Sequence, residues 1–101
     1  MGRADTTTAE KKIDLHGLPE REAIAKFIRD YNAYVREGGR DPIHVVHGYG
    51  SSSGKGGVIQ RALRVFLATH RAKLEGVIEG EVLGNPGFTV VYPKRLLPPS
   101  I

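Results

Sequence analysis

Two short segments of the chain are built in the same way: a strand-forming run ends in histidine and glycine and leads towards a helix. The first is IDLHG at residues 13–17, and the second is IHVVHG at residues 43–48. In an open sheet, neighbouring parallel strands end at the same edge, and ligand sites form at their carboxyl ends. We therefore expect His16 and His47 to meet in one crevice. Because imidazoles exchange protons near neutral pH, this pattern constrains both the fold and the chemistry.

The rest of the chain predicts two helices and two further strands. Apolar residues recur at helical spacing between Pro19 and Gly38, and again after Gly57, so we expect an amphipathic helix in each segment. Runs at residues 77–82 and 88–92 are typical of strands, and a turn rich in glycine and proline separates them. The expected order of elements is βαβαββ.

This order predicts an α/β fold: a two-layer βαβαββ sandwich with a mixed four-stranded sheet and two helices. The first two strands, joined through a helix, should be parallel, and the last two, joined by a short turn, antiparallel. Residues 1–12 are polar, have no apolar period and predict a disordered arm. The folded domain is expected at residues 13–93, followed by a closing tail with two prolines at residues 94–101.

Composition narrows the class of partner. The 101 residues include no cysteine, and no run approaches the roughly 20 apolar residues of a membrane span. The polar N-terminus lacks the apolar stretch of a signal peptide, so we expect a protein of the reducing cytoplasm with no membrane partner. The formal net charge of +4 favours an anionic partner, and nucleic acid is the leading candidate.

Asp14 lies in the middle of the first expected strand, where a carboxylate is costly unless it is paired. Strand alternation puts Asp14 and His16 on one face. The carboxylate is therefore expected to orient an imidazole, either that of His16 or that of His47 on the neighbouring strand. The alternative is a structural aspartate that holds a turn. Two histidines at equivalent strand ends favour a catalytic site made of Asp14, His16 and His47.

The segment GYGSSSGKGG at residues 48–57 predicts a phosphate-binding loop. Glycines let backbone N–H groups approach an anion, and the following helix presents its positive end. It is not a Walker A loop, because Tyr49 and Gly56 stand where that motif needs glycine and Ser or Thr. The alternative is a flexible loop without a ligand. The candidate substrate-binding residues are Gly17, Gly48, Tyr49, Gly50, Ser53, Gly54, Lys55, Gly56, Arg61 and Arg64.

Other polar residues are expected to have structural roles. His44 points away from His47 along the same strand, and His70 should interact with the C-terminal dipole of the second helix. Glu79 and Glu81 share one face of the expected third strand, where a solvated sheet face is favoured over metal ligation. No segment carries a dense carboxylate cluster or close His/Cys spacing, so no metal site is predicted.

These motifs resemble those of the small MutS-related (Smr) domain family. Residues 13–17 resemble its Leu-Asp-Leu-His-Gly motif, and HGYG at residues 47–50 matches its His-Gly-x-Gly motif in the expected order and at the expected distance. GFTVV at residues 87–91 is similar to its third motif, although Asn85 and Pro86 replace the usual glycine run. The resemblance covers roughly residues 12–93. No MutS-type ATPase is present, so the chain resembles a stand-alone member.

The resemblance implies a fold like the C-terminal domain of translation initiation factor 3 and, in many members, endonuclease activity on DNA or RNA. The family's functional positions fall on Asp14, His16, His47, Gly48 and Gly50. The favoured function is a nucleic-acid endonuclease in which one histidine accepts a proton and the other donates one. RNA suits this chemistry best, whereas DNA would require an activated water and Mg²⁺ or Mn²⁺. The alternative is a non-catalytic nucleic-acid-binding module.

Overall fold

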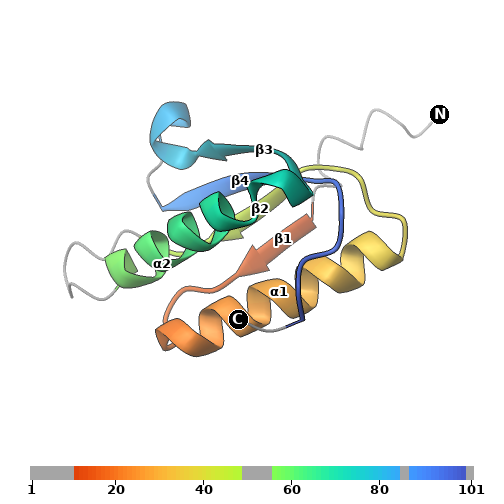
Figure 1. Cartoon of the computed structure of the whole chain (residues 1–101). Coiled ribbons are helices and arrows are strands. Elements are labelled where there is room, and N and C mark those ends of the chain that lie inside the picture. Colours follow the sequence, from red (N-terminus) through yellow and green to blue (C-terminus); the bar gives the residue numbers. More distant parts are fainter. Residues whose placement is uncertain (1–10, 49–55, 85–86, 100–101) are drawn as a thin grey trace.

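A computed structural model describes residues 11–48, 56–84 and 87–99 (Figure 1). Four strands and two α-helices follow one another in these residues in the order βαβαββ. Two short 3₁₀ helices flank the third strand. In chain order the elements are β1 (Lys11–Asp14), α1 (Glu20–Arg36), β2 (Ile43–Val46), α2 (Gly56–Thr69), η2 (Arg71–Lys73), β3 (Leu74–Glu79), η3 (Gly80–Leu83) and β4 (Phe88–Pro93).

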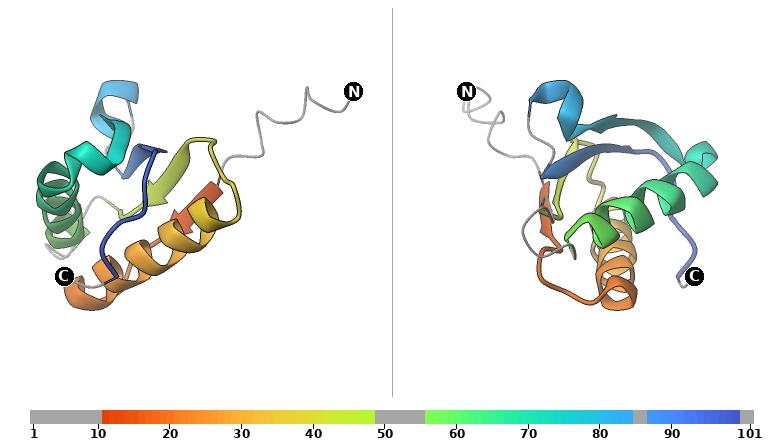
Figure 2. Two further views of the ribbon diagram at one scale, coloured as in Figure 1. Left: turned by 45° about the vertical axis from the view of Figure 1, so that its right-hand side comes forward. Right: turned by 90° about the vertical axis from the view of Figure 1, so that its left-hand side faces the viewer.

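The strands form one mixed sheet in the order β1-β2-β4-β3. β1 and β2 are parallel, while β4 runs antiparallel to both β2 and β3. Both helices pack on one side of this sheet (Figure 2). The buried side chains that face them include Ile13 of β1, Val45 of β2 and Leu15 directly after β1, whereas Asp14 is exposed. The expected two-layer α/β fold is confirmed.

The residues at both ends of α1 favour a helix that begins and ends there. Pro19 precedes it in an extended conformation, and Glu20 and Glu22 place negative charge in the first turn, where it complements the helix dipole. After the last turn, Gly38 has φ +90° and its N–H donates to Val35 O at 3.0 Å. Glycine adopts this left-handed conformation without strain, so the helix ends here as expected. Neither helix of the described segments is long and apolar enough to cross a membrane.

Pairing moves the bounds of two strands away from the expected ones. β1 starts at Lys11 rather than at Ile13, because its residues pair one to one with those of β2. β3 covers residues 74–79 instead of 77–82, because Glu79 is the last residue opposite β4. Glu81 therefore belongs to η3 and not to a strand. The available partner strand determined both boundaries.

The C-terminal tail is part of the folded domain. Leu97 is 3% exposed and belongs to the hydrophobic core. Asn32 of α1 donates from Nδ2 to Leu97 O at 2.9 Å and accepts from Leu97 N at 2.8 Å. The Tyr31 hydroxyl donates to Arg95 O at 2.8 Å. The chain beyond residue 93 thus fastens α1, and the fold extends past the boundary expected from sequence.

Leu97→Ala is expected to lower the free energy of unfolding by about 2–4 kcal/mol, because it leaves a cavity in the core. Leu96→Ala is the matched control: Leu96 is 42% exposed, and such surface substitutions usually change stability by about 0.5 kcal/mol or less. Urea denaturation of both variants measures the difference. Equal midpoints for the two variants would show that the tail does not stabilise the domain.

Candidate active site at the end of strand β1

Asp14 and His16 form a hydrogen-bonded pair where β1 ends. His16 Nδ1 lies 2.5 Å from Asp14 Oδ1, and the His16 backbone N–H donates to the same oxygen at 3.1 Å. The side chains are 66% and 47% exposed for His16 and Asp14. A carboxylate oxygen accepts, so Nδ1 of His16 carries the proton and Nε2 is the nitrogen left for proton exchange. The expected orientation of His16 by Asp14 is therefore present in the structure.

The electrostatics of this pair favour an ionised carboxylate. The hydrogen bond from His16 lowers the pKa of Asp14 below its ordinary value, against a smaller opposing effect of desolvation. The positive charge of Lys12, which is exposed on the same strand, also lowers the pKa of Asp14. Lys26 of α1 donates to the main-chain oxygen of Asp14 at 3.2 Å and supports the strand end. At neutral pH the carboxylate can thus stabilise a positive charge on the His16 ring.

The backbone of the second His-Gly motif lies against His16. Gly48 has φ +79°, and a Cβ placed on it would lie 3.8 Å from the His16 Cβ. The N–H groups of His47 and Gly48 both donate to Gly87 O, each at 3.0 Å. Segments that are far apart in sequence therefore meet beside His16: the ends of β1 and β2 and the residue before β4.

The His47 imidazole does not join Asp14 and His16. It is fully buried, with Nδ1 3.1 Å from Gly48 O and Nε2 2.9 Å from Thr89 Oγ1. Asp14 pairs with Val46 in the sheet, so continuing this register sets His16 opposite Gly48 and leaves His47 opposite Leu15. The strands end at one edge as expected, but the two imidazoles lie on opposite faces. The expectation that they share one crevice is not met.

Behind His47 lies a polar chain that the sequence did not reveal. Thr89 of β4 is 2% exposed, and its hydroxyl lies 3.4 Å from Glu79 Oε1 of β3. Arg64 of α2 donates from Nη2 to the same Glu79 oxygen at 3.2 Å. Glu79 is thus on the helix-covered face and not on a solvated one, and Arg64 already has a carboxylate partner. The only sequence signal for Thr89 was a threonine beside two valines in an otherwise apolar run.

The remaining predicted residues are placed as follows. Gly17, with φ +81°, makes the turn after His16. Gly56 is the first residue of α2, and Arg61 is exposed on that helix. Five of the predicted substrate-binding residues lie outside the described residues: Tyr49, Gly50, Ser53, Gly54 and Lys55. The structure therefore places the helix that follows the predicted phosphate loop, but does not describe the loop's centre.

The two other histidines have the structural positions expected of them. His44 points to the face opposite His47, where its ring centroid lies 4.5 Å from that of Phe88. His70 follows α2, and its Nδ1 lies 3.0 Å from Phe66 O. An N–H donated to a carbonyl of the last turn matches the predicted interaction with the helix C-terminus.

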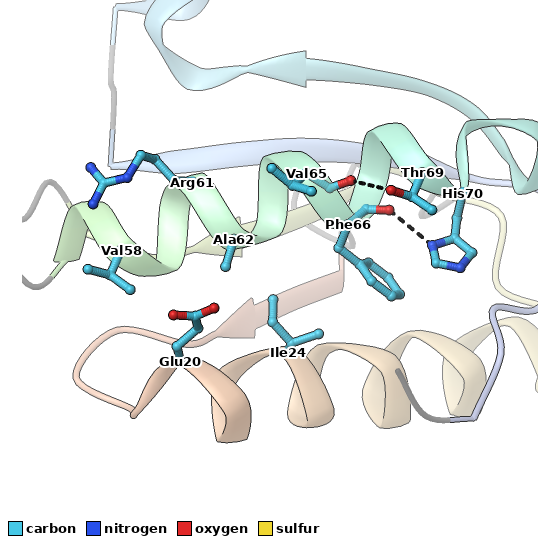
Figure 3. A pocket seen from close by; sticks show the side chains of 9 residues that line it. All are labelled: Glu20, Ile24, Val58, Arg61, Ala62, Val65, Phe66, Thr69 and His70. Carbon is cyan, nitrogen blue, oxygen red and sulfur yellow. Dashed lines mark hydrogen bonds between the residues drawn. The ribbon is translucent and has the colours of Figure 1, made fainter.

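A groove between the two helices is separate from this pair. Glu20 and Ile24 of α1 line one wall, and α2 forms the other (Figure 3). Of the candidate site residues that the structure describes, only Arg61 lines it. Among the described residues, no group of three or more His, Cys, Asp or Glu side chains could hold a metal ion. The Asp14–His16 pair is thus the candidate site that the described geometry supports best.

Comparison with known proteins gives one family. The model of the Smr domain matches residues 13–94. The solved Smr domain of Thermus thermophilus MutS2 is similar in structure, with a TM-score of 0.68 and 25% identity over 83% of this chain and 98% of that one. The solution structure of the SMR domain of NEDD4-binding protein 2 has a TM-score of 0.61 and 27% identity, covering 90% of this chain and 91% of that one.

One curated relative also matches. It is an uncharacterised protein of Treponema pallidum (strain Nichols), 30% identical over 93 residues. The match covers 92% of this chain and 46% of the relative, so the chain spans about half the length of that protein.

Proposed function

Because the chain belongs to the Smr domain family, whose members are nuclease and nucleic-acid-binding modules, we propose that it is a nucleic-acid endonuclease. The observation that carries the proposal is the Asp14–His16 pair, an exposed imidazole held by a carboxylate at 2.5 Å. A module that only binds phosphate needs cations more than an oriented imidazole. The net charge of +4 supports an anionic substrate.

The proposed chemistry assigns proton transfer to His16. Its Nε2 accepts the proton of the attacking oxygen, while Asp14 holds the ring and stabilises the imidazolium that forms. In RNA the attacking oxygen is the ribose 2′-hydroxyl, and the leaving oxygen takes its proton from water. Cleavage of DNA would instead require an activated water and a divalent ion. RNA is therefore the substrate class that this pair suits best.

His47 has a supporting role in this proposal. Both of its ring nitrogens are engaged inside the domain, with Gly48 O and Thr89 Oγ1. A fully buried imidazole cannot reach a phosphate on the surface without rearrangement of the strand ends. We therefore assign the chemistry to Asp14 and His16 and the placement of the Gly48 backbone to His47.

Phosphate binding is assigned to the segment that follows β2. Residues 49–55 with Lys55 precede the N-terminus of α2, whose backbone N–H groups carry a partial positive charge. Arg61 adds an exposed cation one turn further along this helix. Together these groups would neutralise charge on the substrate backbone.

A cleavage assay on purified protein tests the proposal. Single-stranded RNA and supercoiled DNA are incubated with wild type in Mg²⁺, in Mn²⁺ and in EDTA, with His16→Ala as the blank. Cleavage above the blank is the expected result, with RNA cut in EDTA as well. If wild type binds either substrate but never cuts above the blank, the protein is a nucleic-acid-binding module.

Arg61 and Arg64 are expected to differ in their contribution to binding. Arg61→Gln should flatten the dependence of log Kd on log salt by about 0.7–0.9, the value for one lost phosphate contact. Arg64→Gln should change this slope less, because the Arg64 guanidinium already pairs with Glu79 at 3.2 Å. Fluorescence anisotropy with a labelled oligonucleotide across a potassium chloride series measures both. An equal loss of slope for the two variants would show that the ion pair opens on binding.

A further inference from the structure

We propose that Thr89, Glu79 and Arg64 are positioning residues for His47, and that the single hydroxyl proton of Thr89 determines the charge of this buried imidazole. The effect on cleavage rests on the function proposed above, but the effect on His47 does not. The proposal extends the site from an exposed pair to a second set of residues on the other face of the sheet.

The hydrogen bonds that join His47, Thr89 and Glu79 can be arranged in only a few consistent ways. Gly48 O is a carbonyl and can only accept, so Nδ1 of His47 carries a proton. In the neutral ring Nε2 must then accept, and the donor 2.9 Å away is the Thr89 hydroxyl. A neutral His47 ring is therefore the tautomer that is protonated at Nδ1.

Thr89 can donate its hydroxyl proton in either of two directions. Its hydroxyl has one proton and faces two acceptors, His47 Nε2 at 2.9 Å and Glu79 Oε1 at 3.4 Å. If the proton goes to Glu79, Nε2 of His47 must itself carry a proton and donate to the Thr89 oxygen. The His47 ring then has both nitrogens protonated and is positively charged. The direction in which the Thr89 hydroxyl donates is thus coupled to the charge of His47.

Arg64 influences the direction in which the Thr89 hydroxyl donates. Its guanidinium lies 3.2 Å from the same Glu79 oxygen that faces Thr89. The positive charge of the guanidinium beside that oxygen weakens the oxygen as an acceptor and counters the attraction of Glu79 for a charged His47. Arg64 therefore favours donation from Thr89 to Nε2 and the neutral ring. Among the described residues, Glu79 on β3 and Arg64 on α2 are linked to His47 through Thr89, and the Asp14–His16 pair lies on the opposite face of the sheet.

The neutral ring matters because His47 supports the strand end under His16. Its Nδ1 donates to Gly48 O, and the backbone of Gly48 lies against the His16 side chain. A change in the His47 ring would therefore be transmitted through one carbonyl to the backbone beside the reactive pair. This makes Thr89, Glu79 and Arg64 positioning residues, which act through His47.

Nuclear magnetic resonance of the imidazole nitrogens tests the proposal on ¹⁵N-labelled protein. We expect His47 of the wild type to be neutral with its proton on Nδ1 at pH 7. Arg64→Gln should raise the titration midpoint of His47 by roughly half a pH unit or more, and Glu79→Gln should lower it, because a nearby negative charge favours the charged ring. Arg61→Gln, on the same helix, is the control and should leave it unchanged.

The opposite signs make the outcome decisive. Shifts of Arg64→Gln and Glu79→Gln in the same direction, or no shift in either, would overturn the network, as would a wild-type ring protonated only at Nε2. Thr89→Val, which removes the hydroxyl between His47 and Glu79, should reduce both shifts, and Thr89→Ser, which keeps the hydroxyl, should restore them. If Thr89→Val fails to fold, the pair of charge variants still decides the question.

Cleavage rates separate this inference from the proposed function. Thr89→Val should lower kcat and leave Kd for the oligonucleotide within about twofold. Thr69→Val is the control, because the Thr69 hydroxyl bonds to Val65 O on α2, and this variant should leave both kcat and Kd unchanged. If no variant or wild type cleaves but the His47 signals shift as described, the network stands and the endonuclease function fails. If wild type cleaves and the His47 signals do not respond, the network fails alone.

Discussion

His16→Ala is expected to lower the rate of cleavage by about 10²–10⁴-fold, the usual contribution of one general acid–base group. The affinity for nucleic acid should change by less than about tenfold, because one hydrogen bond from an imidazole contributes only roughly 0.5–1.5 kcal/mol. His16 is exposed, and within the described part of the chain its ring is hydrogen-bonded to Asp14, so the fold should survive the change. Single-turnover cleavage and anisotropy titration measure the two effects.

The matched control is His70→Ala, which removes a histidine that follows α2 and is not among the predicted site residues. Its cleavage rate should stay within a few-fold of wild type. Asp14→Asn removes the negative charge that stabilises the His16 imidazolium, so the rising limb of the pH–rate profile should move to lower pH. A His16→Ala variant that cleaves within threefold of wild type would remove His16 from the chemistry.

His47→Ala is expected to destabilise the domain by about 2–4 kcal/mol. The change empties a fully buried site, which leaves a cavity, and it deprives the buried Thr89 hydroxyl of a partner at 2.9 Å. For a domain of this size each kcal/mol corresponds to roughly 4–8 °C in Tm, so a fall of about 8–32 °C should appear in thermal denaturation.

His16→Ala is the control for this loss and should change the Tm by only a few degrees. The two histidines would then be distinguished by their effects. His16→Ala should lower the cleavage rate with little change in Tm, whereas His47→Ala should lower the Tm. Any loss of cleavage in His47→Ala must accordingly be measured at a temperature where the variant is folded. A His47→Ala variant with the Tm of wild type would show that the buried position does not contribute to the fold.

Local sequence signals were sufficient for most of the architecture. Helical periodicity, the acidic first turn of α1 and Gly38 predicted the helices, because each signal acts within a few residues. The Asp14–His16 pair was predictable for the same reason, since residues two apart in a strand share a face. The family itself was recognisable from the motifs at residues 13–17 and 47–50, and the match over residues 13–94 confirms it.

Only the tertiary structure decided what the second histidine does. Alternation predicts which residues of one strand share a face, but the face that is buried depends on where the helices pack and on the register between strands. With Asp14 opposite Val46, Gly48 comes to lie beside His16, and His47 turns into the core. The same packing placed Glu79 under α2 with Arg64 and Thr89, contacts between residues far apart in sequence that no local pattern encodes.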